Sequence, residues 1–346
     1  MPESVMFDIK ASAVLKVIAI IVGVVFLYLL RDVLMILFFA IMIASAVGPF
    51  ADWMESKRIP RILGVLLLYI IVAILMTVLL AILVPVATFE LRQLTQALPQ
   101  FFSNLSSVLE NAQNSSYYFD FFSNIQGLLD DLTEFLQFSS SSVFSLVIKI
   151  FGGFISFVAI IVISFYFSIM RQGIPTFLRS VLPDQYEGYV IGLWKRAEIK
   201  VGRWFQGQLL LALSLGLFVF VGLSLLNVKY ALLLGIIAML LEVVPIAGPV
   251  LAAIPAIILA FFQSTGLGFV VIIFYLLAQQ AENHFLAPVI LGKSTGLNPV
   301  TVIISLLIGA KLAGVLGALI AVPVAVVIVE VLDDMAEKRQ ATLRGE

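Results

Sequence analysis

The sequence contains no cysteine and only one histidine, His284. Without cysteine the chain can form neither a disulfide nor a thiolate metal site, and a single histidine cannot build a histidine-rich site. Motifs of common enzymes are missing too: there is no H-E-x-x-H, no G-x-S-x-G and no G-x-x-x-x-G-K-[ST]. We therefore predict a protein that is not an enzyme, that needs no metal or cofactor, and that hydrolyses no ATP.

Charged residues are also scarce, at 12% of the chain, whereas hydrophobic residues make up 62%. A soluble domain carries about 25% charged residues, so this chain is predicted to be an integral membrane protein in contact with lipid. Its net charge of -1 offers no basic surface to nucleic acid. No polar block is long enough to form a soluble domain, and we predict a single membrane domain over residues 1–346.

Long apolar runs are the main feature that is present. They cover Ala13–Leu30, Val33–Phe50, Ile62–Ala87, Ser145–Met170, Gln208–Leu226, Tyr230–Leu241, Val250–Phe262, Gly268–Ala281, Val300–Ala310 and Leu312–Leu332. A helix needs about 20 apolar residues to cross a bilayer, and several of the later runs are shorter. Because glycine and proline separate them, runs such as 250–262 and 300–310 can either span or re-enter. The predicted fold class is an all-α polytopic membrane protein with short broken or re-entrant helical hairpins in its C-terminal half.

Lysine and arginine in the connecting segments predict the orientation, because they concentrate in cytoplasmic loops. Residues 171–206 are rich in both, and we place them in the cytoplasm with the loop that holds Lys57 and Arg61. This segment is amphipathic: it lies along anionic headgroups or acts as a solvated connector. Residues 88–142 have Arg92 as their only basic residue and are predicted to be an extracytoplasmic, amphipathic helical segment, used for packing or for gating. Both termini are then cytoplasmic.

The stretch "LEVVPIAGPVLAAIP" places the acidic residue Glu242 beside three helix breakers, Pro245, Gly248 and Pro249. A charge in the apolar part of a membrane is costly, so such residues usually face a cavity or a partner. A broken helix also frees backbone groups that can bind ions or polar solutes. Glu242 is therefore a candidate proton or cation site at the turn of a re-entrant hairpin. The alternative is that Glu242 merely ends the helix at the cytoplasmic interface.

A second polar cluster follows in "QQAENHFLAPVILGKSTGLNP". On a helix Gln279, Glu282 and Asn283 share a face, at spacings i, i+3 and i+4, and could line a permeation path. The alternative is a helix end that emerges into water, and His284 is expected at that interface. The helix-breaking residues that follow are Pro288, Gly292, Gly296 and Pro299.

Small residues recur at four-residue steps in the last apolar runs, as in Gly309, Ala313 and Gly317, and such rows let helix backbones approach closely. Ala252, Ala256 and Ala260 form a similar row after the Glu242 stretch. Tight packing between two hairpins is the simplest interpretation, with sliding as a further possibility. Lys311 lies at the apex of the last hairpin, where it could snorkel or pair with a carboxylate, and we keep it as an ion-binding candidate.

Four motifs together resemble the autoinducer-2 exporter family of bacterial and archaeal membrane proteins. They are "FQGQLL" at Phe205–Leu210, "EVVPIAGP" from Glu242, "LAPVILGKSTGLNP" ending at Pro299, and "GVLGALIAVPV" from Gly314. The N-terminal half resembles the family only in its layout. One departure is Val289, where many members have arginine after the proline, and a substrate contact at that position is therefore in doubt.

The resemblance implies about seven or eight transmembrane helices in the cell (inner) membrane and a homo-oligomer, with a pentamer as the expected state. It also implies export of a small polar signal such as autoinducer-2, and sodium/proton exchange is an activity of other members. Our leading hypothesis is a gradient-driven secondary transporter that exports a small polar metabolite or signal. The alternatives are a sodium (lithium)/proton antiporter that uses the same acids, and a membrane scaffold that does not transport.

Overall fold

The computed structural model describes residues 28–78, 153–170, 172–291 and 297–344, with a few isolated positions between 18 and 26 and between 81 and 89. Over these ranges the backbone forms helices and turns and no strand, which confirms the predicted all-α class. Apart from residue 89, the predicted extracytoplasmic segment 88–142 lies outside the described residues, as do part of the first apolar run, Gly292 and Gly296.

The described part of the chain contains both long apolar helices and shorter ones, as expected for a polytopic membrane protein with short hairpin helices. Those long and apolar enough to cross a membrane are Arg31–Ser56 (α2), Arg61–Val78, Asp184–Leu225 (α8), Thr265–Ile290 and Val300–Ala336. The last of these contains a backbone break at Ala313 and Gly314 that divides it into two arms. A further candidate is the pair α6 (Phe154–Ile169) and α7 (Gly173–Val181), which meet at 84°. Two shorter apolar helices are α9 (Ala231–Leu241) and α10 (Ala247–Gln263).

Helix α8 runs without a break over 42 residues. At 1.5 Å per residue it is about 60 Å long, roughly twice the thickness of the hydrocarbon core. The predicted cytoplasmic segment 171–206 contains α7 and the N-terminal half of α8, so residues 184–206 and the apolar run from Gln208 belong to one helix.

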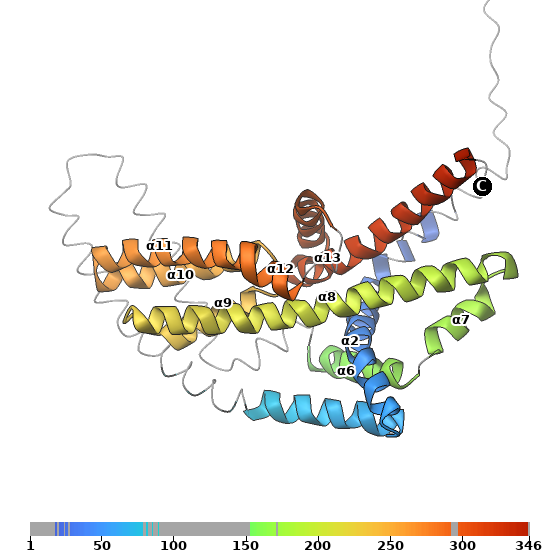
Figure 1. Cartoon of the computed structure of the whole chain (residues 1–346), viewed down its shortest axis with the longest axis horizontal. Helices are drawn as coiled ribbons and strands as arrows, with labels where there is room; N and C mark the ends of the chain where they lie inside the picture. The colour runs from blue at the N-terminus through green and yellow to red at the C-terminus, as the bar shows by residue number, and fades with distance from the viewer. Residues whose placement is uncertain are drawn as a thin grey trace, which may run out of the picture.

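Helix α9 packs along the C-terminal half of α8, α10 packs on α9 and on α11 (Thr265–Ala281), and α11 also contacts α8; the four lie side by side in Figure 1. The alanine row predicted from the sequence faces their common core, since Ala252, Ala256 and Ala260 are fully buried. Small residues also bring α8 and α9 together, because a Cβ on Gly216 would lie 2.9 Å from the carbonyl oxygen of Gly235. The core is made of aliphatic side chains, among them Leu215, Val219, Leu223, Leu234, Ala238, Ala252, Ala256, Ala260 and Val271.

The last apolar runs form a single element, α13 (Pro299–Arg344), which is interrupted at Ala313 and Gly314 by non-helical backbone. The chain reverses there, because a Cβ on Gly317 would overlap the carbonyl oxygen of Gly309. The predicted hairpin with a small-residue contact is thus present, and its break lies just after the predicted one. Lys311 lies two residues before the break and is exposed.

Arg61 joins two turns on the same side of the molecule. Its Nε donates a hydrogen bond of 2.8 Å to the carbonyl oxygen of Ser168 in the last turn of α6, and its Nη1 pairs with Asp52 in α2. The loop after α2 therefore lies beside the connection from α6 to α7. That these two arginine- and lysine-bearing segments lie in the cytoplasm stays a prediction.

Candidate functional site

The break predicted at Glu242 is a compact turn between two short helices. Helix α9 ends at Leu241, residues 242–246 form the turn, and α10 begins at Ala247. Ile246 has a φ of 67°, a left-handed conformation that is costly for a β-branched residue. A Cβ on Gly248 would overlap the carbonyl oxygen of Leu241, so only glycine lets α10 start this close to the end of α9.

The Glu242 side chain is fully buried, with 0% of its surface exposed. Neither of its carboxylate oxygens has a hydrogen-bond partner within the described residues. A charged carboxylate in such surroundings is costly, because water has been removed and the nearby Gln208 amide offsets only part of that loss. Glu242 therefore needs a proton, a cation or a polar ligand when the protein is in this conformation.

Gln208 of α8 contacts this turn and is 1% exposed. Its Nε2 donates a hydrogen bond of 2.6 Å to the backbone carbonyl oxygen of Glu242. Since a carbonyl can only accept, this bond fixes which end of the amide is the oxygen. That oxygen, Oε1, is buried without a partner in the described part of the chain. Sequence reasoning did not select Gln208 as a site residue.

The signal for Gln208 is contained in the motif "FQGQLL", in which three successive residues contact three different segments. Gln206 donates to the carbonyl oxygen of Ala46 in α2, and Gln208 donates to Glu242. A Cβ on Gly207 would lie 2.7 Å from the Leu291 side chain. The motif therefore marks the point where α8 crosses its neighbours, which no local periodicity could indicate.

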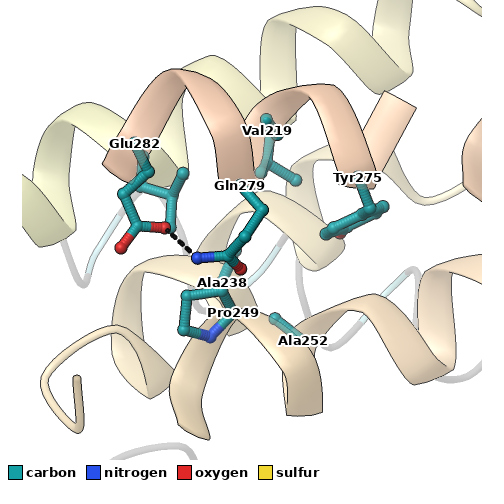
Figure 2. A pocket seen from close by; sticks show the side chains of 9 residues that line it. Val219, Ala238, Pro249, Ala252, Tyr275, Gln279 and Glu282 are labelled. Atoms are coloured by element: carbon teal, nitrogen blue, oxygen red, sulfur yellow. Dashed lines mark hydrogen bonds between the residues drawn. The ribbon is translucent and has the colours of Figure 1, made fainter. Parts of the chain in front are cut away.

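A small cavity lies beside this turn, between α8, α9, α10 and α11. Its lining combines apolar residues with Tyr275, Gln279 and Glu282, which project from α11 and the π-helical turn Glu282–Leu286 (Figure 2). Nε2 of Gln279 donates a hydrogen bond of 3.3 Å to a carboxylate oxygen of Glu282. The cavity has room for about one water molecule. The buried hydroxyl of Tyr275 has no hydrogen-bond partner among the described residues.

The structure brings four of the predicted site residues into one region. Gln279 and Glu282 line the cavity together with Pro249, and the Glu242 carboxylate is near enough to Glu282 for the two to repel each other when both are charged. Glu242 itself lies outside the lining of the cavity and next to Gln208. The cluster thus has two neighbouring parts, one around each acid.

The other predicted residues lie apart from this cluster. Asn283 does not share the buried face of Gln279 and Glu282, because the helix widens into a π turn at Glu282 and the Asn283 side chain is exposed. His284 is also exposed, and its Nδ1 lies 3.0 Å from the carbonyl oxygen of Gln280. Pro288 is exposed, and Pro299 begins α13. Lys311 forms no ion pair within the described ranges.

The chemistry of the cluster is that of oxygen ligands. Across the residues described here, no three His, Cys, Asp or Glu side chains are grouped so that they could hold a metal ion. The available groups are instead two carboxylates, the amides of Gln208 and Gln279, and the hydroxyl of Tyr275. Such a set can bind protons, small hard cations or polar solutes by hydrogen bonding and charge.

Comparison with known proteins gives a consistent result. The model of the AI-2E family transporters matches residues 17–337. YueF of Bacillus subtilis, which is provisionally named a transport protein, is 30% identical over 84% of this chain and 82% of its own. YrrI of the same organism is 25% identical over 88% and 86%, and YhhT of Escherichia coli is 24% identical over 89% and 86%; both carry the same kind of name.

Proposed function

This chain belongs to the AI-2E transporter family, and we propose that it is a gradient-driven secondary transporter in which Glu242 carries the coupling proton or cation. The observation that carries the proposal is the full burial of the Glu242 carboxylate at a helix break, with neither oxygen hydrogen-bonded within the described residues. A residue in this state needs a neutralising ligand, and the ligand must be able to leave if the site is to cycle.

Glu282 and Gln279 provide polar groups next to Glu242, to which a proton or cation can pass. Both line the small cavity beside the break, and the hydrogen bond from Gln279 holds the Glu282 carboxylate toward it (Figure 2). Because the two acids repel each other when charged, neutralising one lowers the cost of charging the other. A proton or cation can thus be passed between them in steps that each involve a single charge.

Two observations bear on the transported substrate, and they favour different candidates. Family membership supports export of a small polar metabolite or signal, with autoinducer-2 as the type of solute. The size of the cavity favours sodium (lithium)/proton exchange, because a space for about one water molecule holds an ion more readily than an organic solute. An organic solute would need a wider conformation than this one. In both cases we propose an inner-membrane protein with cytoplasmic termini that acts as a homo-oligomer, with a pentamer as the expected assembly.

The experiment is a flux assay with the purified protein in proteoliposomes. A proton gradient is imposed, and its dissipation is followed with Na⁺, Li⁺ or a panel of small polar solutes added one at a time. Dissipation that needs only Na⁺ or Li⁺ identifies the antiporter, and dissipation that needs a solute identifies the exporter. Glu242→Gln should abolish flux in either case, whereas Asp184→Asn, an exposed acid at the start of α8, should not. Normal flux by Glu242→Gln would refute the proposal.

A further inference from the structure

We infer that Tyr275 is a positioning residue of the transport site: through one bound water molecule, its hydroxyl fixes the Gln279 amide that holds the Glu282 carboxylate. The ligand of the small cavity is then water in the conformation described here. The inference rests on the proposed function and deepens it, because it names what occupies the cavity beside the helix break and adds a residue that the sequence did not single out.

The first argument is that the hydroxyl of Tyr275 is buried without a partner. The residue is 8% exposed, and its hydroxyl has no hydrogen-bond partner in the described part of the chain. The ring belongs to the aliphatic core that joins α8, α9, α10 and α11, and this packing keeps the hydroxyl from turning out to bulk water. A buried hydroxyl without a partner is costly, and ordered water is the usual partner where the protein provides none.

The second argument is the cavity itself. Tyr275, Gln279 and Glu282 all line it, and they follow one another at spacings of four and three residues along α11 and the π turn. Residues at these spacings lie on one face of a helix. The rest of the lining is apolar, and the space is large enough for about one water molecule. The polar groups are thus gathered along one wall of a cavity of the right size.

The third argument is the direction of the hydrogen bonds. Nε2 of Gln279 donates to Glu282 at 3.3 Å, so Oε1 is the end of the amide that is left to accept. Figure 2 shows Gln279 between Glu282 and Tyr275, with its amide nitrogen toward the carboxylate. A water molecule accepts the hydrogen of the Tyr275 hydroxyl and donates one of its own to Oε1 of Gln279. The amide is then held at both ends, which keeps its nitrogen toward Glu282.

The hydroxyl also favours water over a cation as the ligand of this cavity. A hydroxyl is a donor as well as an acceptor, and a cation would leave the donor of Tyr275 unsatisfied. Small hard cations also take about six oxygen ligands, whereas most of this lining is apolar. An ordered water molecule makes about three hydrogen bonds, which Tyr275, Gln279 and Glu282 can supply.

The direct test is a cryo-electron microscopy map of the full-length protein at a resolution that shows ordered waters. One water should lie within hydrogen-bonding distance of both the Tyr275 hydroxyl and the Gln279 amide. A hydroxyl bonded directly to a protein group, or one with no density beside it, would overturn the inference.

Thermal unfolding of Tyr275→Phe, which removes only the hydroxyl, gives a second test. The Tm in detergent should fall by about 1–3 °C, because a hydroxyl bridged by water contributes a hydrogen bond. If the hydroxyl were unpaired, its removal would raise the Tm instead, and the inference would fail. Tyr69→Phe is the matched control, since the Tyr69 hydroxyl donates directly to Oγ of Ser164 at 2.8 Å and lies outside the cavity lining.

Transport separates a positioning role from a structural one. In the flux assay with Na⁺, Li⁺ and the same panel of solutes, Tyr275→Phe should lower the rate by about three- to tenfold, and Tyr69→Phe should leave it unchanged. In a Gln279→Leu background, Tyr275→Phe should cause no further loss, because the hydroxyl acts through the Gln279 amide.

An equal loss of flux in both backgrounds, or no loss in either, would refute a role of Tyr275 through Gln279. If Glu242→Gln still abolished flux in that case, this inference alone would fail. Normal flux in Glu242→Gln would refute the proposed function, and the map and the Tm of Tyr275→Phe would then still decide whether the water is bound.

Discussion

Arg196 of α8 and Glu330 of α13 form an ion pair in which Nε lies 2.6 Å from Oε1. Lys200, one turn further along α8, pairs with the other carboxylate oxygen of Glu330, and Arg196 also reaches Asp334 at 2.6 Å. Glu330 is buried, so its charge depends on these two cations. The pairs join the N-terminal half of α8 to the C-terminal arm of the hairpin element.

Replacing Glu330 by glutamine should therefore weaken the contact between α8 and α13. The substitution leaves Arg196 and Lys200 without their shared carboxylate, and we expect the Tm in detergent to fall by roughly 2–4 °C. Asp333→Asn is the control, because Asp333 is exposed and forms no ion pair within the described residues. Equal Tm values for the two variants would show that the pair contributes nothing to stability.

The close contact inside α13 leads to a second prediction. A methyl group on Gly317 would overlap the backbone of Gly309, so Gly317→Ala must push the two arms of the hairpin apart. Overpacking of this kind costs about 1–3 kcal/mol, and we expect a lower Tm and a lower yield of folded protein. Gly266→Ala is the matched control, since nothing lies within 4 Å of its Cβ position. If both variants were equally stable, the close approach would be absent from the folded protein.

The adjacent glutamines of α11 provide a third prediction. Gln279 donates a hydrogen bond to Glu282, whereas the side chain of Gln280 is exposed. Gln279→Leu should reduce flux in proteoliposomes by about tenfold, because a hydrogen bond to a charged group contributes about 1.5–3 kcal/mol. Gln280→Leu should transport normally. If Gln280→Leu lost flux and Gln279→Leu did not, the cavity would be excluded as part of the transport path.

The absence of cysteine makes the orientation of the chain in the membrane directly testable, because a single introduced cysteine is then the only thiol that a maleimide can label. Lys57, Arg203 and Lys229 are exposed positions, the last in the turn between α8 and α9. In right-side-out cells a membrane-impermeant maleimide should label Lys229→Cys, and it should label Lys57→Cys and Arg203→Cys only after permeabilisation. If all three variants were labelled to the same extent before permeabilisation, the proposed orientation would be contradicted.

The membrane class, the helical fold and the position of the main break could be predicted because they depend on local composition. Long apolar runs require helices, since a helix satisfies its own backbone hydrogen bonds in lipid. Glu242 stood out because a charge beside Pro245, Gly248 and Pro249 is rare in such a run. The hairpin near Gly314 was likewise indicated by its row of small residues, although the exact residues of the break depend on local φ and ψ.

Other features depended on tertiary structure. The continuity of α8 through residue 206 was hidden, because its polar and apolar halves have the composition of two different segments. Asn283 leaves the face of Glu282 because of a π turn, which i, i+4 spacing does not anticipate. The ion pair between Arg196 and Glu330 spans 134 positions of sequence. Contacts over such distances arise from packing between helices, and no periodicity records them.

The sequence by itself thus determined that the protein lies in the membrane as a set of helices and that one acidic residue sits at a broken helix. Only the tertiary structure decided that this acid is fully buried, that Gln208 from another helix meets it, and that Glu282 is near enough for the two charges to repel each other. The reason is physical: hydrophobicity and backbone preference act along the chain, whereas the surroundings of a buried oxygen are set by whichever helices pack against it.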